Sequence, residues 1–444
     1  MAATTGSSGP LPVAPWRLAG LGHIAYLLRD PVAAFQALRR HGDVVVCYIG
    51  REPVYLINSP MLLHDMFVTH AEAFSKGRMY EELRSAMGNG LGTTHGPLHL
   101  YQRRVIAPTA HQDSLASYVK VMLPEAQAMA SSWHDGQNLA MDQELRDHGA
   151  AMGYKALFGA NVDNRLADEI TTCIVAIQRA VVPRILTPPS AKRLPLPWNR
   201  RWEEHCARLD HLADRLIDAN EDPTTGTATV LPLLAAATSY GTREPLTRVE
   251  MRDEVKSLLM GIPNGTGSSL AWIFYELAKA PHIQERLYNE LITVLADRTP
   301  TVTDFPNLPY LRKVIDEGLR LHSVSWIQTR RTLRPVQVGA IQLPARATVL
   351  FSALAVHRDP ALYADPMTYD PDRWDSTPIK NTFLPFSIGH HRCVGEHLGR
   401  LVMGILLSTV VRNWRLTLAP KTTVHAVPAA ALRPNHLPMI VQAR

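Results

Sequence analysis

The residues with the clearest chemical potential gather in one segment near the end of the chain. It reads FSIGHHRCVGEHLG from Phe386 to Gly399, with a single cysteine, Cys393, among three histidines and three glycines. A helical pattern begins directly after the cysteine, so free backbone N–H groups and the positive end of the helix dipole should favour its thiolate form. Gly389 and Gly395 suit a tight turn and a close approach of the backbone to a flat object. A thiolate on such a turn is one of the few protein groups that can hold a haem iron axially.

Three other interpretations stay open when this segment is considered alone. Cys393 could be an ordinary buried cysteine, which is a common state for this residue, or a catalytic nucleophile. The segment also holds residues of the types that bind zinc, namely His390, His391, Cys393 and His397. Their spacing fits no common zinc motif, which counts against zinc binding.

Four further motifs accompany the cysteine segment in a fixed order. The chain reads GPLHLYQRR over 96–104, EGLR over 317–320, AVHRDP over 355–360 and YDPDRW over 369–374. Together with the cysteine segment, this set resembles the cytochrome P-450 superfamily, whose cysteine signature is Phe-x-x-Gly-x-His/Arg-x-Cys-x-Gly. The resemblance extends from residue 10 to residue 420, which is nearly the whole chain.

The resemblance implies a role for each matching residue of the cysteine segment. The signature is matched at Phe386, Gly389, His391, Cys393 and Gly395. By this resemblance the Cys393 thiolate is the proximal iron ligand of haem b, where it pushes electron density toward cleavage of the O–O bond.

Two other groups of residues take family roles by resemblance. Glu317 and Arg320 match the family's Glu-x-x-Arg helix, and their i,i+3 spacing places acid and base on one helix face. Arg373 would complete the structural Glu-Arg-Arg triad. The family's contacts to the haem propionates would come from His99, Arg103 and Arg330. Arginine is suited to carboxylates because its planar fork can donate two hydrogen bonds at once. Without the resemblance, the first two of these residues would fit a solvated helix face.

A long helix expected over Thr247–Ala280 departs from the family pattern. The family has Ala/Gly-Gly-x-Asp/Glu-Thr-Thr there, and its acid and alcohol deliver protons during dioxygen activation. In this chain Asn264 takes the place of the acid, Gly265 that of the first threonine and Thr266 that of the second. An amide orients water but cannot relay a proton by ionising. Asn264 and Thr266 are nevertheless the candidate catalytic residues.

Three explanations for this altered motif are open. Pro263, which should bend the helix, could turn Thr266 inward. A substrate hydroxyl or a chain of ordered water could deliver the proton instead. Finally, the reaction could be an oxidation that depends less on this relay.

The elements that must position these residues are mostly helical. Helical patterns are expected over residues 60–180, 200–220, 247–280 and 394–413, with Pro281 ending the third. Strands are expected at Val44–Ile49, Val54–Ile57, Val336–Leu343 and Thr348–Leu354, the first two as a hairpin. The proline-rich stretch 183–198 should be an irregular loop or very short helices. The predicted fold class is mostly α with a minor β region, in a single domain over residues 1–444 with an extended arm at 1–15. By resemblance this is the P-450 fold, a triangular helical prism that encloses haem.

Composition excludes several classes of function. The 444 residues are 46% hydrophobic and 19% charged. No run approaches the ~20 apolar residues of a membrane span, and the start of the chain has no basic region of a signal peptide, so we expect no membrane anchor. The net charge of +6 comes without a basic run, which counts against nucleic-acid binding. Four scattered cysteines predict a reducing compartment, the cytoplasm.

The resemblance implies a monooxygenase that inserts one oxygen atom from dioxygen into a C–H bond of an apolar small molecule. A secondary metabolite is expected, with a terpenoid favoured and a polyketide or macrolide next. By analogy the substrate pocket would include Met87, Leu91, Val182, Ile262 and Trp326, which are apolar. The chain has no length left for a fused flavin domain, so electrons should come from a ferredoxin and its ferredoxin reductase. An acidic ferredoxin would dock on the basic side near Arg104, Arg392 and Arg400.

Two alternative functions follow from the altered helix motif and from the haem site itself. The first is a haem-thiolate peroxygenase, or an enzyme that rearranges or couples its substrates. The second is a non-enzymatic haem sensor or carrier. A requirement of turnover for ferredoxin, reductase and dioxygen would separate them.

Overall fold

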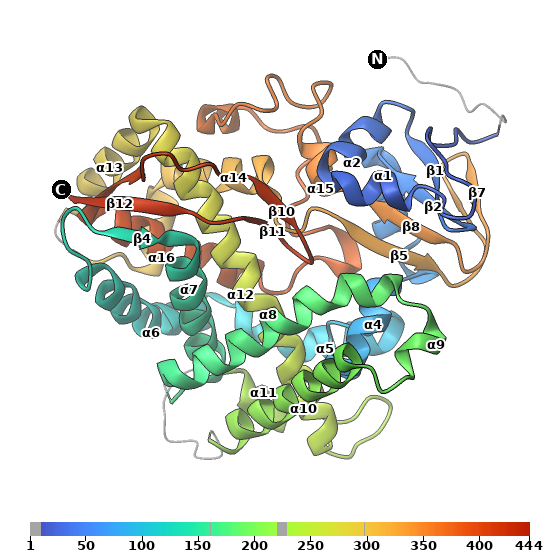
Figure 1. Ribbon diagram of the computed structural model, residues 1–444. Helices are drawn as coiled ribbons and strands as arrows, with labels where there is room; N and C mark the ends of the chain where they lie inside the picture. Colours follow the sequence, from blue (N-terminus) through green and yellow to red (C-terminus); the bar gives the residue numbers. More distant parts are fainter. Residues whose placement is uncertain (1–9, 160, 220–228, 297) are drawn as a thin grey trace.

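The computed structural model describes residues 10–159, 161–219, 229–296 and 298–444 and consists mainly of helices (Figure 1). The helices are α1 (Ile24–Arg29), α2 (Pro31–Arg39), α3 (Pro60–His64), α4 (Arg78–Met87), α5 (Gly96–Ile106), α6 (Gln112–Ser131), α7 (Met141–Phe158), α8 (Asn164–Leu186), α9 (Pro189–Lys192), α10 (Pro197–Asp218), α11 (Val230–Ala235), α12 (Arg248–Lys279), α13 (Pro281–Leu295), α14 (Pro309–Leu321), α15 (Ala353–His357) and α16 (Glu396–Asn413). The strands are β1 (Val44–Ile49), β2 (Glu52–Ile57), β3 (Phe74–Ser75), β4 (Asn138–Ala140), β5 (Gln328–Thr332), β6 (Val336–Val338), β7 (Ile341–Leu343), β8 (Thr348–Phe351), β9 (Trp414–Leu418), β10 (Ala426–Pro428), β11 (Leu432–Pro434) and β12 (Pro438–Ala443). The predicted fold class, mostly α with a minor β region, is confirmed.

Helix α12 crosses the middle of the helical part of the molecule (Figure 1). Its start is fixed by a capping box, in which Thr247 Oγ1 accepts from the backbone of Glu250 and the Glu250 carboxylate accepts from the backbone of Thr247. Its end is fixed by Pro281, which begins α13 at once. Pro263 lies inside the helix. Apolar residues on several faces of α12 are buried in the largest hydrophobic cluster, as expected for a helix at the centre of a core.

The main sheet has the strand order β1-β2-β8-β5-β3 and lies to one side of the helices, next to α1 and α2 (Figure 1). The predicted β1–β2 hairpin is confirmed, and β2 pairs in parallel with β8. Alternate side chains pack on opposite faces, as Val44 and Val45 show by belonging to different hydrophobic clusters. The described part of the predicted arm is extended along this sheet, where Ala14 N donates to Val46 O over 2.9 Å. Residues 1–9 of that arm lie outside the described residues.

Three sequence predictions differ in part from the structure. The stretch 183–198 was predicted as an irregular loop or very short helices, and it does hold the four-residue helix α9. However, α8 continues into it as far as Leu186, and α10 begins within it at Pro197, because proline is well tolerated in a first helical turn. The strand predicted over Val336–Leu343 is instead the hairpin β6–β7, which turns at Gly339 with a φ of 54°. The strand predicted to reach Leu354 ends at Phe351, because the Ser352 hydroxyl accepts from Ala355 N at 3.1 Å and starts α15.

The chain closes on itself through a second sheet of order β4-β12-β9. Strand β12 pairs with β4 and with β9, both antiparallel, so the end of the chain is joined to its middle. Among the residues that the structure describes, no helix combines the length and the apolar character of a membrane span.

Candidate active site

The cysteine segment forms a compact turn in front of α16. Cys393 N donates to Phe386 O over 2.8 Å, and a short 3₁₀ turn spans Gly389–His391 between them. Gly389 has a φ of 67°, and a Cβ at this position would stand 2.0 Å from Phe67 O. Only glycine fits there, since both the backbone conformation and the close approach exclude a side chain. Within the described residues, no group of three or more His, Cys, Asp or Glu is arranged to hold a metal ion, so the geometry gives the zinc alternative no support.

Cys393 differs in exposure from two other cysteines of the chain. Its side chain is accessible, whereas Cys47 and Cys173 are buried. Even so, burial raises the pKa of Cys393, and the Gly395 N–H group lowers it by a smaller amount. The sequence predicted that the start of α16 would favour the thiolate. In the structure desolvation by the surrounding protein outweighs that effect.

A cluster of cationic side chains lies close to this thiol. Its charged members are Lys76, Arg103 and Arg330, and the rings of His99 and His391, which burial keeps neutral by lowering their pKa, lie among them. The rings of His99 and His391 have centroids 4.6 Å apart, and Arg103 Nη1 donates to the Arg392 carbonyl. The structure therefore brings the predicted propionate contacts, His99, Arg103 and Arg330, together with His391 of the cysteine signature. It adds Lys76, which the sequence analysis did not name.

The electrostatics of this cationic cluster call for an anionic partner. Burial lowers the pKa of Lys76 to about 7, with Arg330 adding to the effect. Burial likewise lowers the pKa of Arg330 to about 10 and that of His99 to about 4. The Nε of Arg330 and the Nδ1 of His391 are buried without a hydrogen-bond partner in the described part of the protein. Buried polar atoms are normally paired, so these donors fit a ligand that carries carboxylates.

Lys76 is a site residue that sequence reasoning missed. Its Nζ donates to Leu91 O at 2.6 Å and to Gly92 O at 3.0 Å. The nearby carboxylate is Glu254, which accepts from Leu91 N at 3.0 Å and whose pKa burial raises to about 7. No motif surrounds Lys76 in the sequence, because its role depends on the loop at residues 88–94 lying beside it.

The predicted structural triad is assembled around the Glu317 carboxylate of α14. The Glu317 carboxylate accepts from Arg320 Nε and Nη2, each at 2.8 Å, and from Arg373 Nε at 3.3 Å. It also accepts from Trp374 Nε1 at 3.1 Å and from Asp370 N at 2.9 Å. The side chains of Glu317 and Arg320 are completely buried. The two guanidinium groups thus share a single carboxylate.

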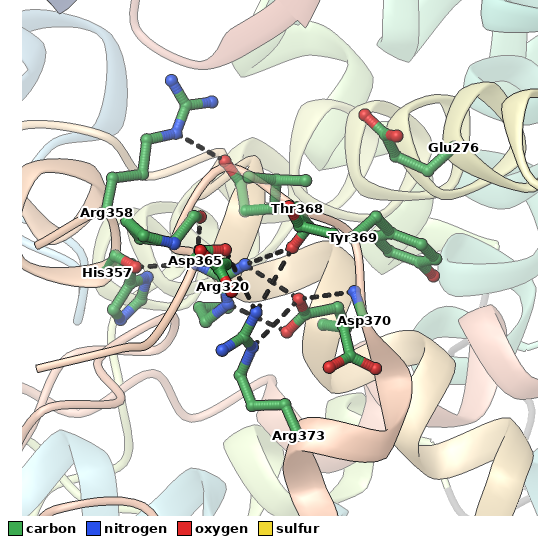
Figure 2. Close-up of polar contacts among 12 residues, drawn as sticks. Glu276, Arg320, His357, Arg358, Asp365, Thr368, Tyr369, Asp370 and Arg373 are labelled. Carbon is green, nitrogen blue, oxygen red and sulfur yellow. Dashed lines mark hydrogen bonds and ion pairs between the residues drawn. The ribbon is translucent and has the colours of Figure 1, made fainter. Parts of the chain in front are cut away.

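Figure 2 shows how the two arginines tie this region together. Arg320 Nη1 donates to His357 O at 2.8 Å, and Nη2 donates to Thr368 O at 3.1 Å. Arg373 Nη2 donates to Asp365 O at 3.3 Å. The triad therefore fixes the end of α15 and the segment at residues 364–374 against α14.

Helix α12 presents a face without side chains to the interior. Gly261 and Gly265 are exposed, although most of α12 is buried. No heavy atom lies within 4 Å of the place where a Cβ would stand at either glycine. Residues four apart share a helix face, so these glycines leave one flat, open surface. Such a surface is what a flat cofactor or a bulky substrate requires.

The two candidate catalytic residues of α12 lie beside this face and are bonded to protein atoms. Thr266 is buried and its Oγ1 donates to Ile262 O at 3.0 Å. Asn264 Nδ2 donates to Gln178 Oε1 on α8. Their roles in proton delivery stay predictions.

The predicted substrate-pocket residues are divided between two hydrophobic clusters, and Ile262 belongs to the larger one together with Met87 and Leu91. Met87 and Leu91 are buried in the largest hydrophobic cluster, and Val182 is partly buried against it. Ile262 packs against α7. Trp326 belongs to a cluster on the main sheet, and its Nε1 donates to the turn between β10 and β11 at 3.0 Å. Their common contact with a substrate stays a prediction.

Comparison with known proteins identifies the family. The family model described as Cytochrome P-450 matches residues 12–440. The chain is 31% identical over 436 residues to cyclooctat-9-en-7-ol 5-monooxygenase of Streptomyces melanosporofaciens, covering 97% of this chain and 95% of that protein. It is 30% identical over 438 residues to pentalenene oxygenase of Streptomyces avermitilis, covering 97% of each. The chain belongs to the cytochrome P-450 family.

A solved structure confirms the fold independently. The crystal structure of the cytochrome P-450DA heme domain superposes with a TM-score of 0.87 at 22% sequence identity, covering 98% of each chain. The predictions of the P-450 fold and of a P-450 monooxygenase are therefore confirmed. Membership implies a haem cofactor, a substrate and dioxygen.

Proposed function

We propose that this enzyme inserts one atom of dioxygen into a C–H bond of an apolar terpenoid, using haem b and electrons from an external ferredoxin. The observation that carries the proposal is the buried cationic cluster beside an accessible cysteine. Haem, when bound, supplies the activation of dioxygen. The chain would hold it through Cys393 at the iron and through Arg330, His99, Arg103 and His391 at the propionates, with Phe386, Gly389 and Gly395 shaping the turn.

The terpenoid class is supported by the relatives and by the apolar character of the predicted pocket residues. Two relatives that align over nearly their whole length are named for the oxidation of cyclooctat-9-en-7-ol and of pentalenene, both of the terpene class. Met87, Leu91 and Val182 supply apolar surface without charge. A polyketide or macrolide is the next candidate.

The electron donor would dock on the side of the cysteine segment that carries exposed arginines. Arg104 is exposed, and Arg392 keeps more than half of its side-chain surface exposed while Nε pairs with Glu396 at 2.7 Å. Arg400 is held more firmly, by Asp316 at 2.6 Å. Exposed positive charge favours association with an acidic ferredoxin, especially at low salt.

The proposed function is tested by reconstitution. Substrates are first screened by the Soret shift that they cause on binding, with terpene hydrocarbons and terpene alcohols as probes. Turnover of a binding compound should then require ferredoxin, ferredoxin reductase and dioxygen together. Turnover with peroxide alone would favour the peroxygenase, and binding of haem without any turnover would favour a sensor. The cytoplasmic location and the single domain stay predictions of cysteine usage and length.

We predict that Arg330→Gln weakens haem retention. Arg330 is buried, and its Nε has no partner among the described residues to compensate for its desolvation. Losing a charge-assisted hydrogen bond costs about 1.5–3 kcal/mol, so haem should transfer to apomyoglobin roughly 10- to 100-fold faster. The neighbouring Arg331→Gln is the control, because Arg331 pairs with Glu81 near the surface. Equal transfer rates in both variants would contradict a propionate contact at Arg330.

For proton delivery, we propose that water or a substrate hydroxyl acts in the space beside Gly265, since the Thr266 hydroxyl already donates to Ile262 O. We expect Thr266→Ala to change the ratio of product to released peroxide less than about twofold, whereas loss of a real proton relay is typically worth 10²–10⁴. Gly265→Thr should fold, because its Cβ meets no atom within 4 Å, and it should raise coupling. Peroxide in place of product from Thr266→Ala would instead assign the relay to Thr266.

A further inference from the structure

A small cavity lies next to α12, on the side that carries Asn264. It measures about 40 Å³, is partly open to solvent and is lined by residues of α7, α8, α12 and the β10–β11 hairpin. Its polar lining comes from Asp142, Arg146, Gln178, Arg179, Asn264 and Arg433. Ser268 contributes a hydroxyl group, and the rest of the lining is Val175, Ala271, Ala429, Ala430, Ala431 and Pro434. The cavity is thus polar, although α12 is a helix of the core.

Positive charge exceeds negative charge in this lining. Three guanidinium groups face one carboxylate, and Asp142 Oδ1 already accepts from Leu437 N at 2.8 Å. Arg146 is satisfied by Asp147, through Nε at 2.8 Å and Nη2 at 3.1 Å. The Arg179 side chain is exposed and makes no ion pair or hydrogen bond with the rest of the described chain. With Asp142 and Asp147 set against the three guanidinium groups, one positive charge is in excess here.

Arg433 contributes to the cavity from β11. It is partly buried and makes a single side-chain hydrogen bond within the described residues, from Nη1 to Pro434 O at 3.3 Å. Burial lowers the pKa of Arg433, the like charges of Arg179 and Arg146 lower it further, and Asp142 raises it. The neighbouring like charges repel one another, and an anion bound between them would reduce that repulsion.

The α12 side of the cavity offers amides where a carboxylate would neutralise the arginines. Asn264 donates to Gln178 Oε1, and Gln178 Nε2 donates to Met260 O at 3.0 Å. Both side chains are uncharged, so neither balances Arg179 or Arg433. Since Asn264 stands where the P-450 sequence pattern has an acid, the lining lacks the one charge that α12 could have supplied.

We propose that this cavity binds a small monovalent anion, chloride or a carboxylate of formate size, between Arg179 and Arg433. A volume of this size accommodates an ion or a few waters, since one water needs about 10–15 Å³ by the same measure. Guanidinium groups are suited to such a ligand because they stay charged and present several donors. The bound anion would hold α8 and the β10–β11 hairpin against α12. This inference is independent of the substrate and of the redox partner.

The test compares chloride with gluconate, which is too large for the cavity, at equal ionic strength. Thermal unfolding of the haem-loaded protein is followed by circular dichroism. Chloride should raise the midpoint by roughly 1–3 °C along a saturating curve, as expected for a ligand of the folded state. An equal midpoint in both salts at all concentrations would overturn the proposal.

Matched variants assign the effect to the cavity. Arg433→Gln removes a positive charge, and Asn264→Asp supplies an internal negative charge, so each should abolish the chloride-specific rise. The control is Arg415→Gln, an exposed arginine on β9, which should keep it. A rise that persists unchanged in the first two variants would place the effect elsewhere and sink the proposal.

Crystals of the unmutated protein soaked in bromide give a second measurement that does not depend on the folding of any variant. An anomalous peak between Arg179 and Arg433 supports the site. Peaks confined to other places refute it.

Discussion

Replacing Cys393 by alanine is expected to abolish the red-shifted Soret band that thiolate-ligated haem gives in its reduced carbon monoxide complex. The expectation follows from the accessible sulfur beside a buried cationic cluster. Alanine offers the iron no donor atom, and oxygen insertion should be lost with the band. The fold should survive, because the turn is closed by the backbone bond from residue 393 to Phe386 O and by Gly389, neither of which needs the sulfur.

Two further variants make this expectation specific. Cys206→Ala removes a free cysteine on α10 and should leave the spectrum intact. Cys393→His offers an imidazole in place of the thiolate and should give the spectrum of histidine-ligated haem. A thiolate-type spectrum that persists in Cys393→Ala would move the iron ligand to another residue and overturn the haem assignment.

Local rules explain why much of the fold could be predicted from the sequence. Thr247 and Pro281 were sufficient to place the ends of α12, since capping and proline act within one helical turn. The spacing of Glu317 and Arg320 places both on one helix face wherever the helix lies. The same kind of local rule predicted the turn between β1 and β2 and therefore their hairpin. The strand β8 was predicted too long, because the sequence analysis did not recognise Ser352 as the N-cap of α15.

The remaining features depend on contacts between distant segments, which spacing does not contain. Nothing near Lys76 in the sequence distinguishes it from a surface lysine, yet it is buried between the loop at 88–94 and Arg330. The thiolate preference of Cys393 was predicted from the start of α16 alone, and the burial that reverses it comes from other elements. The partner of Asn264, which is Gln178, likewise became visible only when α12 was placed against α8.

Truncating Glu317 should cause a large loss of stability among single substitutions in this chain. Glu317→Ala leaves Arg320 completely buried with its charge unpaired and removes the acceptor of Arg373. Breaking a buried ion pair from one side costs ~3–5 kcal/mol. For a chain of this length that corresponds to a fall in melting temperature of about 1 °C per kcal/mol. Purified haem-loaded protein should therefore melt roughly 3–5 °C lower, with a reduced yield.

The surface pair of Arg334 and Glu72 is the matched control for this loss. Both side chains are more than half exposed, although their 2.8 Å separation equals that of the buried pair. Exposed pairs contribute about 0–1 kcal/mol, so Glu72→Ala should melt within about 1 °C of the unmutated protein. Glu317→Gln keeps one oxygen acceptor and replaces the other with an N–H donor group, without the charge. Its melting temperature should fall between those of Glu317→Ala and Glu72→Ala. If haem-loaded Glu317→Ala melted at the same temperature as Glu72→Ala, the triad would not stabilise the fold. The buried and the exposed ion pair would then contribute the same free energy at the same distance, although water is excluded from only one of them.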